Sequence, residues 1–549
     1  MGMHDFVIRN AALLDGLGSE PFTADLAVRD GKIAGIGKSL SAKEIVDAGG
    51  LALMPGIIDN HTHYDAQITW DPMVSPSSAL GVTTAIIGNC GFTIAPCKPA
   101  ERELVMKNLT QVEGMSLDVL RQGIRWDFET IPQYFDMLER QGCAINVAGF
   151  VGHSSVRTYV MGADAPRRAA TAEEIARMRA LVVEGMRAGA VGFASSTSPA
   201  HNGDGGLPMP SRLADDAELR ALVGALKDAG RGLFMLTKGG HTRISFLEEL
   251  AAQSSRPVVV AALLHNSTNP RSVFDDLDAI AQANSRGHRL VGAISCCPLS
   301  MDFTLRSPYT FEGLESWKPA LPLKGAAYVE KLKERGFRDA VRAELARPAH
   351  FRLFNGQWDQ VEVIASARKE CEQRSIGELA RAAGRDPLDA MLDLALEENL
   401  DTVFNAMLLN SDEQAVAEML RHPASLVSLS DAGAHLTFFN DAGFGLHLLG
   451  HWVRERGALS LPEAVRRLTS TPAELFGIRN RGALKPGYAA DLMLFDPRTV
   501  GRGAKQRVFD LPGDHPRLTT PARGLHGVWV NGERNLQRLP GRVLRDFSP

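Results

Sequence analysis

Short apolar runs recur through the middle of the chain, and most of them lead directly into polar residues. Each run has the length of a strand, and together they cover residues 54–61, 82–90, 145–153, 190–196, 232–238, 257–265, 289–295 and 425–431. Amphipathic stretches lie between them, and Thr171 and Glu174 have the spacing of a capping box for a helix that we expect to end at Gly189. Alternating strands and helices predict a parallel sheet covered by helices, and eight such strands can close into a (β/α)₈ barrel.

Both ends of the chain carry a different pattern, in which short apolar runs are separated by tight-turn signals. RDGK near the start and Asn531-Gly532 near the end are typical of hairpin turns. We therefore predict an α/β protein in which residues 1–54 and 481–549 form one small β domain and residues 55–480 form the barrel. Residues 298–400 are richer in charges, have a helix-like pattern and lack the regular alternation of strand and helix that the barrel shows. We therefore expect an insertion or lid there.

Composition excludes several classes of protein. The chain has 549 residues, of which 44% are hydrophobic and 23% charged, so it is not a disordered chain. A net charge of −4 opposes nucleic-acid binding, which depends on clustered cations. We see no secretory signal and no apolar run near the ~18 residues of a membrane helix, and we expect a cytoplasmic protein with no membrane partner. The six cysteines are too few for a disulfide framework.

Polar side chains that can carry chemistry gather where the predicted strands end. In a barrel these carboxyl ends share one face, where active sites lie. His61 and His63 are two positions apart on a strand, so both imidazoles point to one side and can bind one metal ion. The alternative is a pair of surface histidines. The other candidates are Cys90, His153, Lys238, His265 and Asp431.

Four segments together resemble a known group of enzymes. LALMPGIIDNHTHYD, GVTTAIIGNCG, LSDAGAH and GALKPGYAADLMLFD resemble the amidohydrolase superfamily, and GNCG and VGHSSVRTYVMG resemble its N-acyl-D-amino-acid deacylase (D-aminoacylase) branch. The resemblance runs from about residue 5 to about residue 535 and is thin through 298–400. It implies a metal-dependent (β/α)₈ barrel with a β-sandwich built from both chain ends, in agreement with the pattern above.

The resemblance also implies roles for individual residues. It makes His61 and His63 ligands of one zinc ion and Cys90 a thiolate that bridges to a second metal position. His265 matches the histidine ligand of the sixth strand, and Asp431 matches the aspartate of the eighth strand that serves as general base. The alternatives are that Cys90 is a small buried thiol and that Asp431 is a turn residue.

The fifth strand departs from the family pattern, because Lys238 stands where the deacylases carry a histidine ligand. A protonated lysine cannot ligate a metal, since it has no lone pair. Lys238 could be carboxylated and become a ligand, His241 could take its place, or one zinc ion could suffice with Lys238 nearby, which we prefer. The remaining alternative is a lysine that neutralises a nearby thiolate or carboxylate.

Substrate recognition departs from the family as well. The lysine and arginine that hold the substrate carboxylate in D-aminoacylases are missing from their usual places, although Arg306 or Arg243 could substitute. We predict that His153, His435 and Arg306 contact substrate; the alternative for the two histidines is that each is a satisfied core histidine. We expect His201, in a polar loop, to face solvent, and the alternative is that it lines the site.

These expectations combine into one function. We predict zinc-dependent hydrolysis of a C–N amide bond in a small N-acyl compound, with one or two zinc ions. Metal-bound hydroxide would attack the carbonyl, while Asp431 takes a proton and returns it to the leaving nitrogen. The alternatives are a cyclic amide, imide or lactone hydrolase using the same site, and a non-catalytic barrel that lost a metal ligand. The partner that we expect is the small-molecule substrate, and the sequence leaves open whether the chain forms a homo-oligomer.

Overall fold

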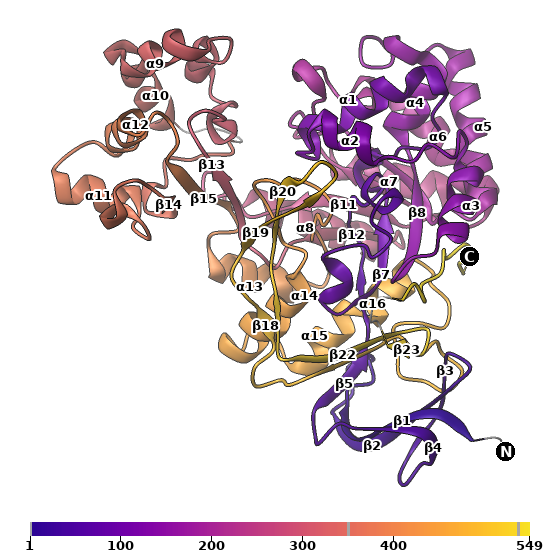
Figure 1. Cartoon of the computed structure of the whole chain (residues 1–549). Helices are drawn as coiled ribbons and strands as arrows, with labels where there is room; N and C mark the ends of the chain where they lie inside the picture. The colour runs from indigo at the N-terminus through magenta and orange to yellow at the C-terminus, as the bar shows by residue number, and fades with distance from the viewer. Residues whose placement is uncertain (1–2, 348–351, 535–537, 549) are drawn as a thin grey trace. The chain divides into compact units, whose positions relative to one another are not determined.

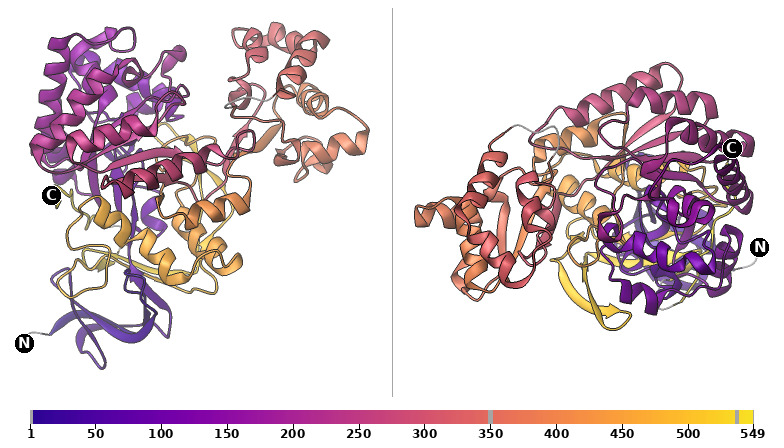
Figure 2. Two further views of the ribbon diagram at one scale, coloured as in Figure 1. Left: turned by 180° about the vertical axis from the view of Figure 1, so that it is seen from behind. Right: turned by 90° about the horizontal axis from the view of Figure 1, so that it is seen from above.

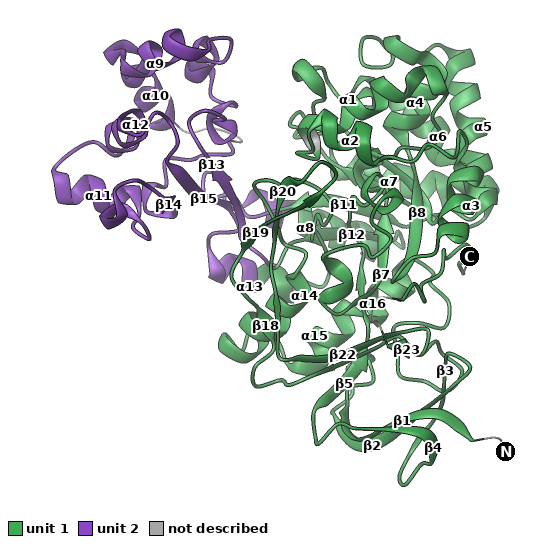
Figure 3. Cartoon of the chain, in the orientation of Figure 1, with its two compact units in different colours: residues 1–263, 276–296, 417–549 green, residues 264–275, 297–416 purple. Residues whose placement is uncertain are grey.

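A computed structural model describes residues 3–347, 352–534 and 538–548 (Figure 1). The chain divides into two compact units, each with both helices and strands (Figure 3). The first unit comprises residues 1–263, 276–296 and 417–549, and the second comprises residues 264–275 and 297–416.

A parallel eight-stranded sheet forms the centre of the first unit. Each strand lies beside the next one of the sheet along the chain, as the predicted alternation of strand and helix requires. Most of the strand residues are buried, because helices cover the outer face and side chains fill the interior. The strands are β6 (Ile57–Asp59), β7 (Val82–Ile87), β8 (Asn146–Gly152), β9 (Gly192–Ser196), β10 (Leu233–Thr237), β11 (Val258–Leu263), β12 (Leu290–Ile294) and β16 (Ser425–Val427).

The sheet closes because its first and last strands meet. Thr62 and Ala432, just beyond β6 and β16, form a parallel bridge, and the backbone N–H of His63 donates to the carbonyl of Ala432 at 2.8 Å. Deeper in the seam, the Asn60 amide donates to the Val427 carbonyl at 2.9 Å. The predicted (β/α)₈ barrel is therefore confirmed.

Helices surround the barrel strands of the first unit (Figure 2). In α5, Met178, Val182 and Met186 lie on the buried side, at the spacing that places side chains on one helix face. The helices of this unit are α1 (Arg102–Val112), α2 (Leu117–Gly123), α3 (Ile131–Gln141), α4 (His153–Met161), α5 (Ala172–Ala188), α6 (Asp216–Ala229), α7 (Ile244–Ser254), α14 (Phe444–His447), α15 (Leu461–Leu468) and α16 (Ser470–Leu475). Two more, α8 (Ser272–Ser285) and α13 (Glu413–Arg421), have residues in both units.

A second sheet in this unit joins the two ends of the chain. Its link is the antiparallel pair β5–β17, and its core includes Ile8, Leu26, Leu53, Leu492 and Trp529. The strands are β1 (His4–Leu13), β2 (Phe22–Arg29), β3 (Lys32–Gly37), β4 (Ala42–Asp47), β5 (Ala52–Pro55), β17 (Leu492–Phe495), β22 (Leu525–Val530) and β23 (Glu533–Arg534). Two small ribbons pair β18 (Gly501–Arg502) with β21 (Ala522–Arg523), and β19 (Gln506–Leu511) with β20 (His515–Thr519).

The second unit contains helices, as expected for 298–400, and also a small antiparallel sheet that the sequence pattern did not predict. The strand order is β13-β15-β14. Polar residues such as Asp302, Glu362 and Asn405 interrupt the apolar pattern of these strands. The region was therefore not recognised as containing a sheet from its sequence. The elements are β13 (Leu299–Phe303), β14 (Val361–Ala365), β15 (Val403–Leu409), α9 (Gly325–Lys333), α10 (Arg335–Leu345), α11 (Ile376–Ala383) and α12 (Pro387–Glu397). Among the described residues of both units, no helix is long and apolar enough to cross a membrane.

The predicted capping box of α5 is present and offers a test of the helix assignment. The Thr171 hydroxyl accepts from the Glu174 N–H at 3.3 Å, and the Glu174 carboxylate accepts from the Thr171 N–H at 2.8 Å. We expect Thr171→Ala to lower the free energy of unfolding by about 1 kcal/mol, because it removes an N-cap acceptor. Urea denaturation would measure it, with Arg177→Ala at an exposed position of the same helix as control. Equal stability of the two variants would contradict the assignment.

Candidate metal centre and active site

Three potential metal ligands meet at the carboxyl ends of the first two barrel strands. His61 and His63 follow β6, and Cys90 lies in the turn after β7. Their ligand atoms all lie within 4.8 Å of one another, and all three residues are buried. The Cys90 sulfur lies 3.5 Å from His61 Nε2 and 3.9 Å from His63 Nε2.

Asp431, which follows the last barrel strand, completes this cluster. Its Oδ1 lies 3.2 Å from His61 Nε2 and 3.7 Å from His63 Nε2. The Asp431 side chain is 24% exposed, whereas those of His61 and His63 are 3% and 6% exposed. The carboxylate is therefore the member of the cluster that solvent can reach.

The cluster has the chemistry and spacing of a zinc site. Two imidazoles, a thiolate and a carboxylate are ligands that Zn²⁺ prefers. Bonds of about 2.0–2.3 Å in a tetrahedral site would separate ligand atoms by about 3.3–3.8 Å. The distances from Asp431 Oδ1 and Cys90 Sγ to the two Nε2 atoms, 3.2–3.9 Å, are close to that range.

Burial and charge set the protonation of these groups. Burial lowers the pKa of His61 to about 4, so this imidazole is neutral and its Nε2 lone pair is available. Burial alone would raise the pKa of Asp431, but its contacts with the imidazoles of His63 and His61 hold that pKa below its usual range. Burial raises the pKa of the Cys90 thiol, so forming its thiolate requires a cation beside the sulfur.

The backbone brings the loops of this cluster into direct contact. Gly433 has φ +92°, and a Cβ there would lie 2.7 Å from the carbonyl carbon and oxygen of His63. In the turn after β7, the Asn89 amide donates to the Ile86 carbonyl at 2.8 Å. The Thr237 hydroxyl of β10 lies 3.1 Å from the Cys90 sulfur and fixes it from the other side.

Lys238, predicted as a metal ligand, is turned away from the cluster. Its Nζ donates to Asp276 at 2.7 Å. Successive side chains of a strand point to opposite faces, and here it is Thr237 that reaches Cys90. An ammonium paired with a carboxylate has no lone pair for a metal, so this contact opposes the prediction. His241, the proposed replacement, is exposed.

His265 and Arg306 belong to the second unit. The backbone N–H of His265 donates to the Asn410 side chain at 2.7 Å. The buried Nδ1 of the His265 imidazole has no hydrogen-bond partner among the described residues. Arg306 pairs with Asp401 at 2.7 Å, and both side chains are largely exposed. The predicted roles of His265 as ligand and of Arg306 at the substrate stay predictions.

A family model described as "Amidohydrolase family" matches residues 44–534. The chain belongs to the amidohydrolase family. It is therefore a hydrolase, in agreement with the resemblance found in its motifs.

Relatives of this amidohydrolase match it over nearly the whole chain. An N-acyl-D-aspartate deacylase of Alcaligenes xylosoxydans xylosoxydans is 28% identical, with 98% of this chain and 95% of the relative covered. A D-aminoacylase of the same organism is 28% identical, with 96% and 93% covered. A crystal structure of N-acyl-D-glutamate deacylase from Bordetella bronchiseptica, complexed with zinc and a phosphonate inhibitor, is 26% identical with a TM-score of 0.66, covering 99% and 100% of the two chains.

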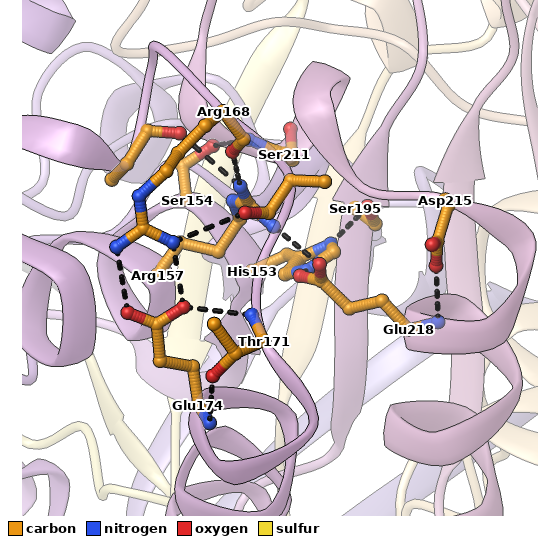
Figure 4. Close-up of polar contacts among 12 residues, drawn as sticks. His153, Ser154, Arg157, Arg168, Thr171, Glu174, Ser195, Ser211, Asp215 and Glu218 are labelled. Carbon is orange, nitrogen blue, oxygen red and sulfur yellow. Dashed lines mark hydrogen bonds and ion pairs between the residues drawn. The ribbon is translucent and has the colours of Figure 1, made fainter.

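His153, predicted to contact substrate, is instead fully buried in a polar network of the amidohydrolase (Figure 4). Its Nδ1 lies 2.8 Å from the Ser195 hydroxyl, and its Nε2 lies 2.8 Å from Glu218, whose other oxygen pairs with Arg157. Both ring nitrogens are engaged, so neither is left for a substrate. The structure favours the alternative of a satisfied core histidine.

A small cavity of the first unit contains the cluster and residues that sequence reasoning missed or misplaced. His435 lines it, and its predicted contact with substrate stays a prediction. His201 also lines it, contrary to the expectation of a solvent-facing loop, with Nδ1 2.7 Å from the Ser196 hydroxyl and its ring against Phe92. Its position shortly after a barrel strand is the signal that could have placed it. Glu113 lines the cavity without any such signal, since it follows a helix.

The close contact at Gly433 provides a test of the cluster. We expect Gly433→Ala to weaken zinc binding at least 10-fold, because the new methyl group would push the Asp431 loop away from His63. Titration of the metal-free protein with zinc against a competing chelator would measure this. Gly230→Ala is the matched control, since Gly230 also has a positive φ but no atom within 4 Å of an added Cβ. Equal zinc affinity of both variants would contradict the geometry.

Proposed function

We propose that this amidohydrolase uses bound zinc to hydrolyse the carbon–nitrogen amide bond of a small N-acyl compound. The observation that carries the proposal is the convergence of His61, His63, Cys90 and Asp431 at one mouth of the barrel. The deacylases named above support it, because they match nearly the whole chain. The zinc in the N-acyl-D-glutamate deacylase structure supports the choice of metal.

His61, His63 and Cys90 would hold the ion, and Asp431 lies beside them within reach. When bound, zinc would supply a water of lowered pKa and would polarise the substrate carbonyl. One ion is favoured over two, since Lys238 pairs with Asp276 and leaves the fifth strand without its usual ligand.

Asp431 is the proton carrier of the proposed reaction. The neighbouring imidazoles keep its carboxylate ionised at neutral pH, so it can accept a proton from the attacking water. Its partial exposure leaves it open to the cavity, where a substrate would lie. Asp431 then returns the proton to the leaving nitrogen, because an amine leaves readily only when it is protonated.

A second candidate substrate is a neutral or cyclic amide, imide or lactone. No residue lining the described cavity of the first unit is lysine or arginine, while Asp431 and Glu113 both line it. A substrate carboxylate would find no bidentate guanidinium among these lining residues. The same hydrolytic apparatus would act on a ring amide or an ester.

The role of Asp431 can be tested by removing its charge. We expect Asp431→Asn to keep bound zinc and to lower kcat by at least about 100-fold, because the amide cannot accept the proton. Zinc content and turnover would be measured together. Asp25→Asn, at a buried aspartate of the terminal sheet that accepts from the backbone of Asn10 and Leu40, is the control for burial. Full activity of Asp431→Asn would place the base elsewhere.

The substrate class can be tested with a panel of compounds. N-acyl-D-amino acids, their neutral amide counterparts, hydantoins and lactones would be offered to the zinc-loaded enzyme. We expect turnover of amides, with neutral substrates showing a higher kcat/KM than carboxylate-bearing ones, because no lysine or arginine lines the described cavity to hold a substrate carboxylate. A chain that binds no zinc and gains no activity when zinc is added would instead be a non-catalytic barrel.

A further inference from the structure

Glu113 places a buried carboxylate behind one of the proposed metal ligands. It follows α1 directly and lines the same cavity as His63. Its Oε1 lies 3.2 Å from His63 Nδ1, and the two side chains are 3% and 6% exposed. Glu113 therefore approaches the ring nitrogen opposite to the one that faces Cys90 and Asp431.

This carboxylate has no other partner that would explain its burial. The described residues give neither oxygen of Glu113 a hydrogen bond, and the 3.2 Å approach to His63 Nδ1 is its ion-pair contact. A buried carboxylate is costly unless it is paired. The imidazole of His63 is therefore the group toward which Glu113 is directed.

We propose that Glu113 is a positioning residue for the metal centre: it accepts the Nδ1 proton of His63 and so holds the Nε2 lone pair toward Cys90 and Asp431. A neutral imidazole carries its proton on one nitrogen, and a carboxylate at Nδ1 fixes both that choice and the ring orientation. The proposal rests on the proposed function for the identity of the metal.

A second histidine–glutamate pair in the same unit shows what a purely structural pair looks like. His153 Nε2 lies 2.8 Å from Glu218, but that carboxylate also pairs with Arg157, and His153 Nδ1 contacts Ser195 (Figure 4). Both ring nitrogens of His153 and both oxygens of Glu218 are engaged in that network. In the Glu113–His63 pair, by contrast, the far nitrogen of the imidazole faces the cluster of ligands.

The loop that carries Glu113 is fixed against the loop that follows Asp431. Gly114 has φ +61°, and a Cβ there would lie 2.9 Å from the Phe438 ring and 3.1 Å from the His435 Cα. This close approach leaves little room for Glu113 to shift. The carboxylate therefore has a defined position relative to both loops of the metal centre.

The test removes the charge of Glu113 and keeps its shape. We expect Glu113→Gln to weaken zinc binding 10- to 100-fold in a chelator competition, because the amide can donate to Nδ1 and favour the wrong tautomer. The visible spectrum of the cobalt-substituted protein should change as well, since it reports the ligand geometry. Glu113→Asp, which keeps the acceptor, should recover part of the affinity.

Glu218→Gln is the matched control, because it alters a buried histidine–glutamate pair outside the cavity. We expect it to lower thermal stability and to leave zinc affinity and the cobalt spectrum unchanged. Unchanged zinc affinity in Glu113→Gln would overturn the proposal, and so would complete loss of zinc, which would make Glu113 a ligand. Both readouts concern metal binding, so a wild-type protein that binds zinc but hydrolyses no amide would refute the proposed function alone.

If Glu113→Gln does not fold, nitrogen-15 NMR of the histidine-labelled, zinc-loaded wild-type protein decides the question. A proton on His63 Nδ1 would support the proposal. A proton on Nε2 would overturn it.

Discussion

The closure of the barrel is the constraint on which the active site depends. The bridge between Thr62 and Ala432 joins the residues after the first strand to those after the last. The Ser430 hydroxyl donates to the His61 carbonyl across the same seam, although the two residues are 369 positions apart. Without this pairing, nothing would hold the Asp431 carboxylate, at the end of the last strand, beside the two imidazoles at the end of the first strand. The contacts that close the barrel are thus the same contacts that assemble the cluster.

Most of the fold could be predicted because the barrel repeats one signal. Apolar strands that end in polar residues mark both the sheet and the mouth of the barrel, so His61, Cys90 and Asp431 were found together with their strands. The readings of Lys238 stayed open because its contacts depend on the strand register, which places Thr237 at Cys90 and Lys238 at Asp276. Glu113 follows a helix, where no strand pattern points to the mouth. The contacts of Lys238 and Glu113 are determined by tertiary structure and leave no local pattern in the sequence.

The two buried histidines that contact glutamate show how the same pair of residues serves different ends. His153 is saturated by Ser195 and Glu218, so its polar groups stabilise the packing of neighbouring elements. His63 has Glu113 at one nitrogen and a cluster of ligand atoms at the other. An imidazole becomes available for chemistry when one nitrogen is held and the other faces a cavity. Burial and residue type do not distinguish the two cases, whereas the complete set of partners does.

Family membership constrains the reaction of this chain more strongly than it constrains the substrate. The groups proposed to hold the metal and to carry the proton are positioned by the barrel seam and by the turn after β7. Substrate recognition lies on loops, which can change while the barrel persists. Two of the relatives are named for acyl derivatives of acidic amino acids, and the described cavity is lined by four histidines as well as by Glu113 and Asp431. The side chains that line the cavity are therefore a more direct basis for choosing test substrates than the names of relatives at 28% identity.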